Sequence, residues 1–464
     1  MTDSTPSAAV RPGILAAALL LLELLAGMQA YVLSMVAPLV AGEFHAQQYY
    51  GVLAGIAQIA MFVTIPLGPA LLQRFSVNAL LLWLTGLSVV GGVVSAVAPS
   101  LVIFLAGRAV SGLAGGALAT VSLAAIVTVL PPAWRRAVLA GYNAMWVCTS
   151  LVGPLYAGWI AAVLSWRWSL VLYLPLLLVA RAIIARQLSG TMRPGDRRER
   201  APVGPAIVLA GGICVLSAVG LQDLPAMAAI GAGAIGTAVS LLASARLLPP
   251  GTLRARRGRP AALASMGLLT GAYFGAWAIM SILVHDLLGG SATAVAVTLG
   301  AGGLGWAVAG LGTSRWPAST PAAYARRARV GCALLVLGLA GVGAVLVGGW
   351  RAGSGVVAAG WTLAGLGMGL LYLDTLNHIV DVPVEADGVS VPRAAASAIL
   401  VESIASAVCS TAAAAVVGRG ITHGNGPLSA VVVLAAAAAL AMAILLTSRR
   451  IDPSLADTPT ARRT

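Results

Sequence analysis

The sequence contains no lysine, and charged residues of every kind are scarce: they make up 9% of its 464 residues, whereas 59% are hydrophobic. A soluble domain carries about 25% charged residues, so the composition excludes a soluble globular protein. Apolar runs such as Ile14–Leu22 and Ala430–Leu446 do not alternate with polar residues, which excludes an outer-membrane barrel. Because long apolar runs are typical of bilayer-spanning helices, we predict an all-α polytopic membrane protein.

Cysteines are also few. Cys148, Cys214, Cys332 and Cys409 all fall within apolar runs and have neither zinc-site nor disulfide spacing, so we expect four buried free thiols and no metal. Residues 1–13 contain one Arg, and no cleavage site follows a short apolar core. The first apolar run is therefore expected to remain as a helix rather than to be removed as a signal peptide.

The sequence lacks a Gly-Lys-Ser/Thr phosphate loop, so the chain itself is not expected to hydrolyse ATP. The segment Gly300-x-Gly302-x-x-Gly305 matches a dinucleotide-binding fingerprint. It lies in an apolar helical run that no strand precedes, which favours tight helix packing instead. We expect neither an enzyme nor a cofactor.

All 28 basic residues are Arg, and the net charge is +14. Most of them lie in short gaps between apolar runs, which is the pattern that orients membrane proteins and is not typical of a nucleic-acid-binding surface. The pattern predicts fourteen spans with both termini cytoplasmic, in the plasma membrane, and the composition suggests a bacterial inner membrane. Membrane lipid and a small-molecule substrate are the expected partners, no nucleic acid is expected, and the chain is expected to act as a monomer.

The apolar runs predict two six-helix bundles, at residues 14–185 and 261–447. Between them lie a basic cytoplasmic loop (186–203) and a two-helix insertion (204–247), and a cytoplasmic tail covers 448–464. Within this scheme we expect the second helix at Tyr50–Leu72 and the thirteenth at Ala395–Gly418.

An internal repeat links the predicted fourth and twelfth helices. Ala106–Leu118 and Ala359–Leu371 align without gaps, and the alternative is a chance match of abundant Gly and Ala. A duplication shifted by two helices fits the insertion, and repeats of this kind build transporters. The matched pairs are Ala106/Ala359, Gly107/Gly360, Gly112/Gly365, Leu113/Leu366, Gly116/Gly369 and Leu118/Leu371.

Two motifs point to a known family. The fifth helix carries Gly153-Pro-Leu-Tyr-Ala-Gly158, in which Pro154 frees a backbone carbonyl and the glycines permit close packing. The fourth helix carries Leu105-x-x-Arg108-x-x-x-Gly112. Together the motifs resemble those of the drug:proton antiporters of the major facilitator superfamily, and the helix count resembles their fourteen-spanning branch.

The resemblance implies a secondary active transporter that works by alternating access. It implies efflux of a hydrophobic drug, antibiotic or secondary metabolite, with the proton gradient as the energy source. Export of a lipid or of a specific small metabolite on the same fold is the alternative. The sequence departs from the family in two places. In the loop after the second helix, Gln73–Asn78 retains only Arg74 of the residues in the family's loop motif. In the first helix, Gln29 replaces the Asp of the family's pattern.

An ionised side chain inside the membrane has a high free-energy cost, so each such residue is expected to have a function or a partner. We expect proton or cation coupling at Glu23, Arg108, Glu402 and Asp374, with Glu23 as the main site. A solvated crevice or a fixed structural pair is the alternative for Glu23, and a polar helix end in water is the alternative for Asp374. His285-Asp286, His45 and His423 lie at predicted outer helix ends and are expected to be solvated.

A substrate cavity is expected between the helices that line it in the resembling fold, although each aromatic residue could instead serve packing or face lipid. Its residues would be Gln29, Tyr31, Tyr273, Trp277, Trp361, Tyr372 and Asn377.

A cytoplasmic gate is the last prediction from sequence. Arg74 lacks the acidic loop partner usual in the family, and the resemblance places the second helix across from the helix of Glu402. We predict that Arg74 and Glu402 approach when the protein closes to the cytoplasm. The alternative is that Arg74 contacts lipid phosphate.

Overall fold

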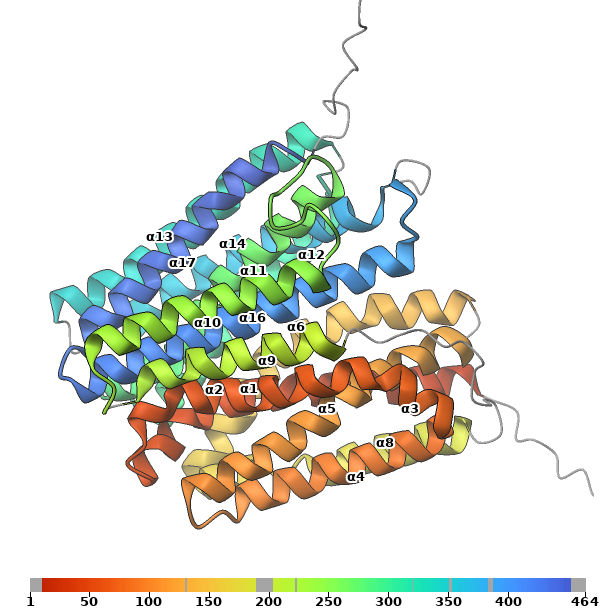
Figure 1. The fold of residues 1–464 in the computed structure, drawn as a ribbon, viewed down its shortest axis with the longest axis horizontal. Coiled ribbons are helices and arrows are strands. Elements are labelled where there is room, and N and C mark those ends of the chain that lie inside the picture. Colours follow the sequence, from red (N-terminus) through yellow and green to blue (C-terminus); the bar gives the residue numbers. More distant parts are fainter. Residues whose placement is uncertain are drawn as a thin grey trace, which may run out of the picture. The chain divides into compact units, whose positions relative to one another are not determined.

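The computed structural model describes residues 11–129, 132–188, 203–221, 223–318, 320–349, 353–382 and 387–451. Over these ranges the chain is helical and contains no strand (Figure 1). Thirteen described helices are long and apolar enough to cross a membrane, and α6 contributes a shorter apolar stretch, Cys148–Val163. The predicted all-α polytopic fold is therefore confirmed. Most of the predicted basic loop and of the C-terminal tail lies outside the described residues.

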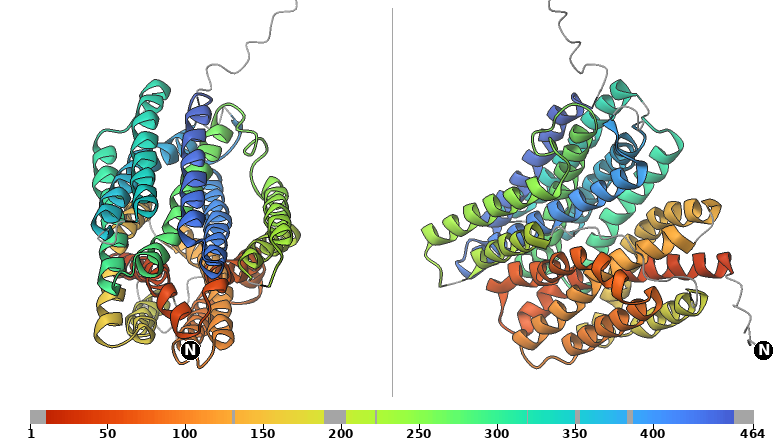
Figure 2. Two further views of the ribbon diagram at one scale, coloured as in Figure 1. Left: turned by 90° about the vertical axis from the view of Figure 1, so that its left-hand side faces the viewer. Right: turned by 45° about the vertical axis from the view of Figure 1, so that its right-hand side comes forward.

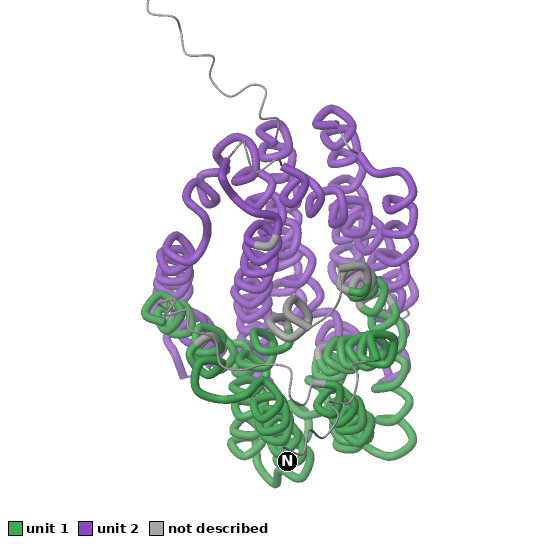
Figure 3. The backbone as a smooth tube through the Cα atoms, turned by 90° about the vertical axis from the view of Figure 1, so that its right-hand side faces the viewer, with its two compact units in different colours: residues 1–46, 56–211 green, residues 47–55, 212–464 purple. Residues whose placement is uncertain are grey.

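The internal contacts of the chain divide it into two units, and residues 1–46 and 56–211 form unit 1 (Figure 3). Its helices are α1 (Pro12–Glu43), most of α2 (Tyr50–Thr64), the short η2 (Ile65–Leu67), α3 (Gly68–Arg74), α4 (Val77–Ala96), α5 (Leu101–Val129), α6 (Pro132–Val163), α7 (Trp166–Ser169), α8 (Leu174–Leu188) and the start of α9 (Val203–Ser217).

Residues 47–55 and 212–464 form unit 2. Its elements, visible from further sides in Figure 2, are η1 (Gln47–Tyr49), the first turns of α2, the end of α9, η3 (Ala218–Gly220), α10 (Ala226–Leu247), α11 (Arg259–Ile282), the π-helical η4 (Leu283–Leu287), α12 (Ala292–Arg315), α13 (Pro321–Gly348), α14 (Ser354–Val380), α16 (Val391–Thr422) and α17 (Gly426–Ser448).

Two helices differ from their predicted bounds, which the apolar runs define only to within several residues. The second helix is not continuous to Leu72, because Pro66 and Pro69 interrupt it: α2 ends at Thr64, η2 follows, and α3 starts anew at Gly68. The thirteenth helix starts at Val391 rather than at Ala395, with a Pro in its first turn. Glu402 therefore lies about three turns into α16.

The core of unit 1 contains a buried cluster to which α1, α4 and α8 all contribute. Leu15, Leu19 and Leu22 lie on one face of α1 and are buried together with Leu81 of α4 and Ile184 of α8. The spacing of three and four residues along α1 puts these side chains on one stripe. The opposite faces of many helices remain apolar and exposed in the chain itself, which suits a protein whose helices meet lipid.

All four cysteines are free, as predicted, but the expectation that all four are buried is wrong. Cys148 and Cys214 are exposed, Cys409 is half-buried and only Cys332 is buried. An apolar run shows that a helix can enter a membrane, but it does not show which face of the helix the protein covers.

Glycine brings the second and fourth helices of each predicted half into backbone contact. In unit 2 a Cβ at Gly365 of α14 would overlap the carbonyl oxygen of Gly302 on α12, and one at Gly369 would overlap that of Trp306. In unit 1 a Cβ at Gly112 of α5 would overlap the carbonyl oxygen of Ala57 on α2, and a Cβ at Gly116 would overlap the carbonyl oxygen of Met61. Two matched pairs of the repeat thus make the same contact.

The matched pair Gly107 and Gly360 shows the same equivalence at the third helices. Gly107 of α5 lies against the carbonyl oxygen of Gly91 on α4, and Gly360 of α14 lies against that of Gly338 on α13. Three glycine pairs in one register favour duplication over a chance match. The segment 300–305 also serves packing, as predicted: a Cβ at Gly302 would overlap the ring of Trp361.

The Gly365 contact can be tested by adding one methyl group. Gly365→Ala is expected to destabilise the protein by about 1–3 kcal/mol, because the new Cβ meets backbone that cannot rotate away. Gly341→Ala on α13 is the matched control, since no atom lies within 4 Å of its Cβ. It should leave stability unchanged or raise it by up to about 1 kcal/mol. Thermal unfolding of the purified variants in detergent measures the difference, and equal effects would contradict the packing.

Candidate functional site

A cluster of aromatic rings lies inside unit 2. Tyr273 of α11 and Trp361 of α14 are both buried, and their rings stack with centroids 4.8 Å apart and an angle of 15°. Trp306 of α12 meets Tyr273 edge-on at 5.6 Å. Gly302 makes this arrangement possible, because any side chain there would occupy the place of the Trp361 ring.

The cluster continues from the buried rings to half-buried ones. Trp306 contacts Phe274 at 6.1 Å and Tyr372 at 5.5 Å, and Phe274 contacts Trp277 at 6.2 Å. All of these pairs are edge-to-face, the geometry in which one ring presents its positive edge to the negative face of the next. The half-buried rings therefore pack against the buried pair of Tyr273 and Trp361.

The cluster ends at a carboxylate. The hydroxyl of Tyr372 donates a hydrogen bond of 2.9 Å to Oε2 of Glu402, which is half-buried on α16. Ring faces attract cations, and a carboxylate supplies the full opposite charge. The combination is suited to binding a hydrophobic cation.

Four of the predicted cavity residues come together in this cluster: Tyr273, Trp277, Trp361 and Tyr372. Asn377 does not, because it is exposed near the end of α14. Sequence reasoning missed Phe274 and Trp306. Trp306 follows Gly302 by four residues and so lies on the same face of α12, which is the signal that could have found it.

A second polar group lies inside unit 1. Gln29 of α1 and Tyr173, which precedes α8, share a hydrogen bond, and Arg108 of α5 lies close to the same phenol. Arg108 is buried, and its Nε has no hydrogen-bond partner among the described residues. Sequence reasoning named Gln29 and Arg108 but missed Tyr173, the side chain that joins them.

The antiporter motif abuts α1. A Cβ at Gly153 would lie 2.8 Å from Cβ of Tyr31, which is buried and hydrogen-bonded to Ser150. Pro154 lies inside α6, and Gly158 is buried one turn further on. Tyr31 therefore packs at the contact between α1 and α6, directly against the motif.

Glu23 is half-buried on α1 and interacts with a neighbouring side chain or backbone group. The buried Leu22 and Leu25 flank it. Nearer the end of the same helix, Glu43 pairs with Arg167 at 2.7 Å and accepts a hydrogen bond of 2.6 Å from Trp166 Nε1. Sequence reasoning missed Glu43, which ties the end of α1 to α7.

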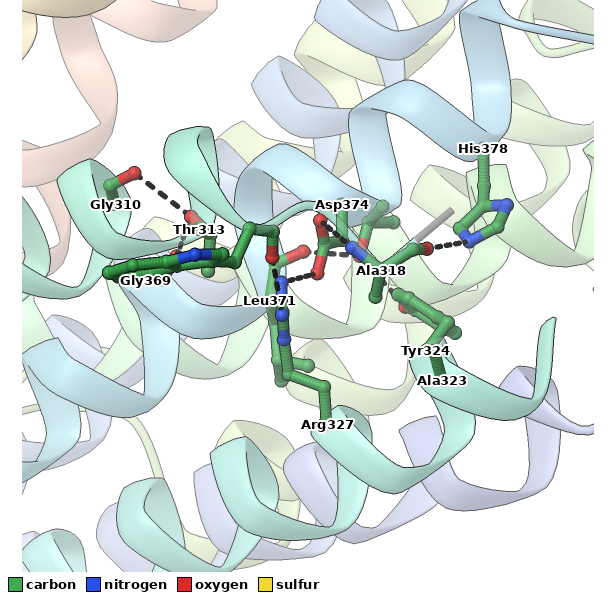
Figure 4. A network of polar contacts seen from close by, with 12 residues as sticks. Gly310, Thr313, Ala318, Ala323, Tyr324, Arg327, Gly369, Leu371, Asp374 and His378 are labelled. Atoms are coloured by element: carbon green, nitrogen blue, oxygen red, sulfur yellow. Dashed lines mark hydrogen bonds and ion pairs between the residues drawn. The ribbon is translucent and has the colours of Figure 1, made fainter. Parts of the chain in front are cut away.

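Asp374 is the centre of a polar network at the end of unit 2 where α12, α13 and α14 meet (Figure 4). Its side chain is 1% exposed and pairs with Arg327 of α13 at 2.5 Å. It also accepts a hydrogen bond of 3.1 Å from the backbone N–H of Ala318. His378 bonds to the carbonyl oxygen of the same residue at 3.1 Å. The alternative of a helix end in water is thereby excluded for Asp374, which holds the turn between α12 and α13.

A similar clamp closes the start of α11. Arg259 is buried, donates hydrogen bonds of 2.9 Å to the carbonyl oxygens of Ile379 and Val382, and pairs with Asp387 at 2.6 Å. It ties α11 to the end of α14 and to the segment before α16. Arg74, in contrast, is exposed at the end of α3. Because Arg74 and Glu402 belong to different units, their approach stays a prediction.

The Asp374 clamp predicts a stability effect. Asp374→Asn keeps an acceptor for the Ala318 N–H but removes the charge that pairs with Arg327, so we expect a loss of about 3–5 kcal/mol. Asp381→Asn is the control because Asp381 is exposed. Thermal unfolding of both variants measures the difference. Equal curves would show that the ion pair does not stabilise the fold.

Comparison with known proteins identifies the family. A model of the Major Facilitator Superfamily matches residues 19–386. A Mycobacterium tuberculosis protein named as a probable multidrug-efflux transporter is 30% identical over 220 residues, which are 43% of this chain and 46% of that protein. A protein named an efflux pump from Aspergillus brasiliensis is 33% identical over 134 residues, 28% of this chain and 24% of its own length. The chain thus matches less than half the length of these relatives.

Solved structures agree on the fold. A bacterial homologue of the human lysosomal transporter Spinster, in an inward-facing conformation, aligns over 97% of this chain and 98% of its own with a TM-score of 0.65 and 12% identity. The human organic anion transporter MFSD10 aligns over 94% and 99% with a TM-score of 0.58 and 15% identity. At the level of the superfamily, the resemblance stated from the motifs is confirmed: the chain belongs to the major facilitator superfamily, a family of membrane transporters.

Proposed function

We propose that this protein is a secondary active transporter that exports hydrophobic cations in exchange for protons. The observation that carries the proposal is the aromatic cluster that ends at the Glu402 carboxylate. The names of the relatives support efflux as the direction. Antibiotics and secondary metabolites with a protonated amine are compounds of this class.

The cluster divides the work of binding between two parts. Trp306 and Tyr372 offer half-buried ring surface to the apolar body of the substrate, while Glu402 offers the charge. The buried stack of Tyr273 on Trp361 holds Trp306 in place from behind. A preorganised ring wall limits the side-chain entropy that binding costs.

The Glu402 carboxylate is also suited to exchanging a proton for a substrate cation. A half-buried Glu402 carries one negative charge, which either a proton or a substrate cation neutralises but not both at once. Competition for one charge makes inward proton movement and outward cation movement alternate, as antiport requires. Glu23 on α1 remains our candidate for the proton that drives the conformational cycle, because it too lies half-buried within a spanning helix.

Binding of a cation–anion pair of equal shape tests the charge recognition. We expect the purified protein to bind tetraphenylphosphonium and to bind tetraphenylborate far more weakly. Glu402→Gln should weaken tetraphenylphosphonium binding about tenfold or more, and Trp306→Leu by about tenfold. Trp316→Leu is the matched control, because Trp316 is exposed after the end of α12. Equal affinity for both ions, or an unchanged affinity in Glu402→Gln, would contradict the proposal and favour a lipid or neutral-metabolite exporter.

Coupling is tested separately in proteoliposomes with an imposed pH gradient. Glu23→Gln is expected to keep cation binding and to lose gradient-driven accumulation, because the amide cannot take up or release a proton. Glu43→Gln is the control, since Glu43 ends the same helix and already pairs with Arg167. If Glu23→Gln still concentrates the cation against its gradient, the coupling residue lies elsewhere, with Glu402 as the next candidate.

A further inference from the structure

The start of α2 contacts unit 2, although most of this helix belongs to unit 1. Residues 47–55, called the 47–55 segment below, group with residues 212–464 by their contacts. Helix α2 continues without a break from Tyr50 to Thr64 and thus passes from one unit into the other. Any transport step in which the units move relative to each other must release this segment from unit 2 or break the helix.

Small residues allow the 47–55 segment to pack closely against α16 and η3. A Cβ at Gly51 would lie 2.6 Å from Cβ of Ala415, and one at Gly418 would lie 3.2 Å from Cβ of Tyr50. A Cβ at Gly55 would lie 3.0 Å from Oγ1 of Thr411. None of these contacts involves a charged group, so they can separate without leaving a charge unpaired.

One polar contact ties the segment to a different helix. The hydroxyl of Tyr50 donates a hydrogen bond of 2.5 Å to Oδ2 of Asp286, and Nδ1 of His285 lies 2.7 Å from Oδ1 of the same carboxylate. Tyr50 is buried, and the Asp286 side chain is 13% exposed. The prediction that His285 and Asp286 are solvated is therefore wrong for Asp286, because Tyr50 covers it.

The backbone of η4 places the carboxylate. Residues Leu283–Leu287 form a π-helical turn at the end of α11, and such turns are frequent at functional sites. The helices packed against η4 are α11, α12 and α17. Helix α17 has no titratable side chain, and α12 has only Arg315 at its opposite end. Arg419, near the end of α16, donates to the carbonyl oxygens of Leu221 and Leu224. Among the residues that the structure describes, Tyr50 and His285 hydrogen-bond to the Asp286 carboxylate.

We infer that Tyr50, Asp286 and His285 form a latch that holds the 47–55 segment on unit 2 and that must open for transport. The hydrogen bond from Tyr50 to the Asp286 carboxylate is a polar contact that the segment has to break in order to leave unit 2. Tyr50 and Asp286 are the moving and fixed halves of the latch, and His285 positions the carboxylate. By the predicted topology the latch lies on the outer side of the membrane.

The test measures how often the segment lifts from α16. Thr411 is buried directly beneath Gly55, so a cysteine there reacts only when the 47–55 segment moves away. The full chain, with its four native cysteines replaced by Ser, carries Thr411→Cys in right-side-out membrane vesicles. A membrane-impermeant maleimide is added outside. Tyr50→Phe and Asp286→Asn should each raise the labelling rate by about 10- to 100-fold, the factor expected when a hydrogen bond to a charged group is lost.

Tyr49→Phe is the matched control, because it removes the same atom from the adjacent residue, and it should leave the rate unchanged. The double variant Tyr50→Phe/Asp286→Asn should label no faster than the faster single variant, since both changes break one bond. His285→Gln should give a smaller increase than Asp286→Asn. Monodisperse elution of each variant shows that it remains folded.

Two outcomes overturn the latch. One is a rate in Tyr50→Phe equal to that in Tyr49→Phe, and the other is a double variant whose increase equals the product of the single increases. Labelling requires no substrate, so the result does not depend on whether the protein exports cations. Failure of the cation-binding test would leave the latch standing, and failure of the latch would leave cation binding standing.

Discussion

The contact on which the rest of unit 2 depends is the backbone approach of α12 and α14 at Gly302 and Gly365. A membrane offers no hydrophobic gain for pushing helices together, so close packing of small residues has to hold them. Here that packing also leaves the space in which the ring of Trp361 lies flat on Tyr273 and supports Trp306. The same residues that join the helices thus shape the candidate binding surface, and α5 and α2 repeat the contact in unit 1.

Charge inside the membrane is used in two ways. At helix ends, carboxylates are clamped by arginines: Asp374 by Arg327, Asp387 by Arg259 and Glu43 by Arg167. These pairs hold turns and helix ends together. Within the helices, Glu402 instead accepts a hydrogen bond from the phenol of Tyr372, and in the proposed function its charge serves a cation or a proton. Because an unneutralised charge is costly in that environment, it favours taking up a cation or a proton.

Much of the candidate site follows from the sequence. The parts that could not be predicted were all missed for the same reason. Tyr273, Trp277, Trp361 and Tyr372 were named because they lie on helices that line the cavity in the resembling fold. Their grouping was not predictable, since apolar helices without a polar face give no periodic signal for rotation about their axes. The same uncertainty hid the roles of Trp306 and Tyr173, and it made two exposed cysteines look buried.

The sequence by itself determined the helical membrane fold, the repeat and the family motifs. These follow from composition and spacing, which act over one helix or between aligned segments. Only the tertiary structure decided which polar groups meet. Tyr50 and Asp286 are 236 residues apart, and each looked like an ordinary residue at the outer end of a helix. Their hydrogen bond joins the 47–55 segment, which glycines let approach α16, to the π-helical turn that contains Asp286. The glycine contacts and the hydrogen bond are both properties of packing between distant segments.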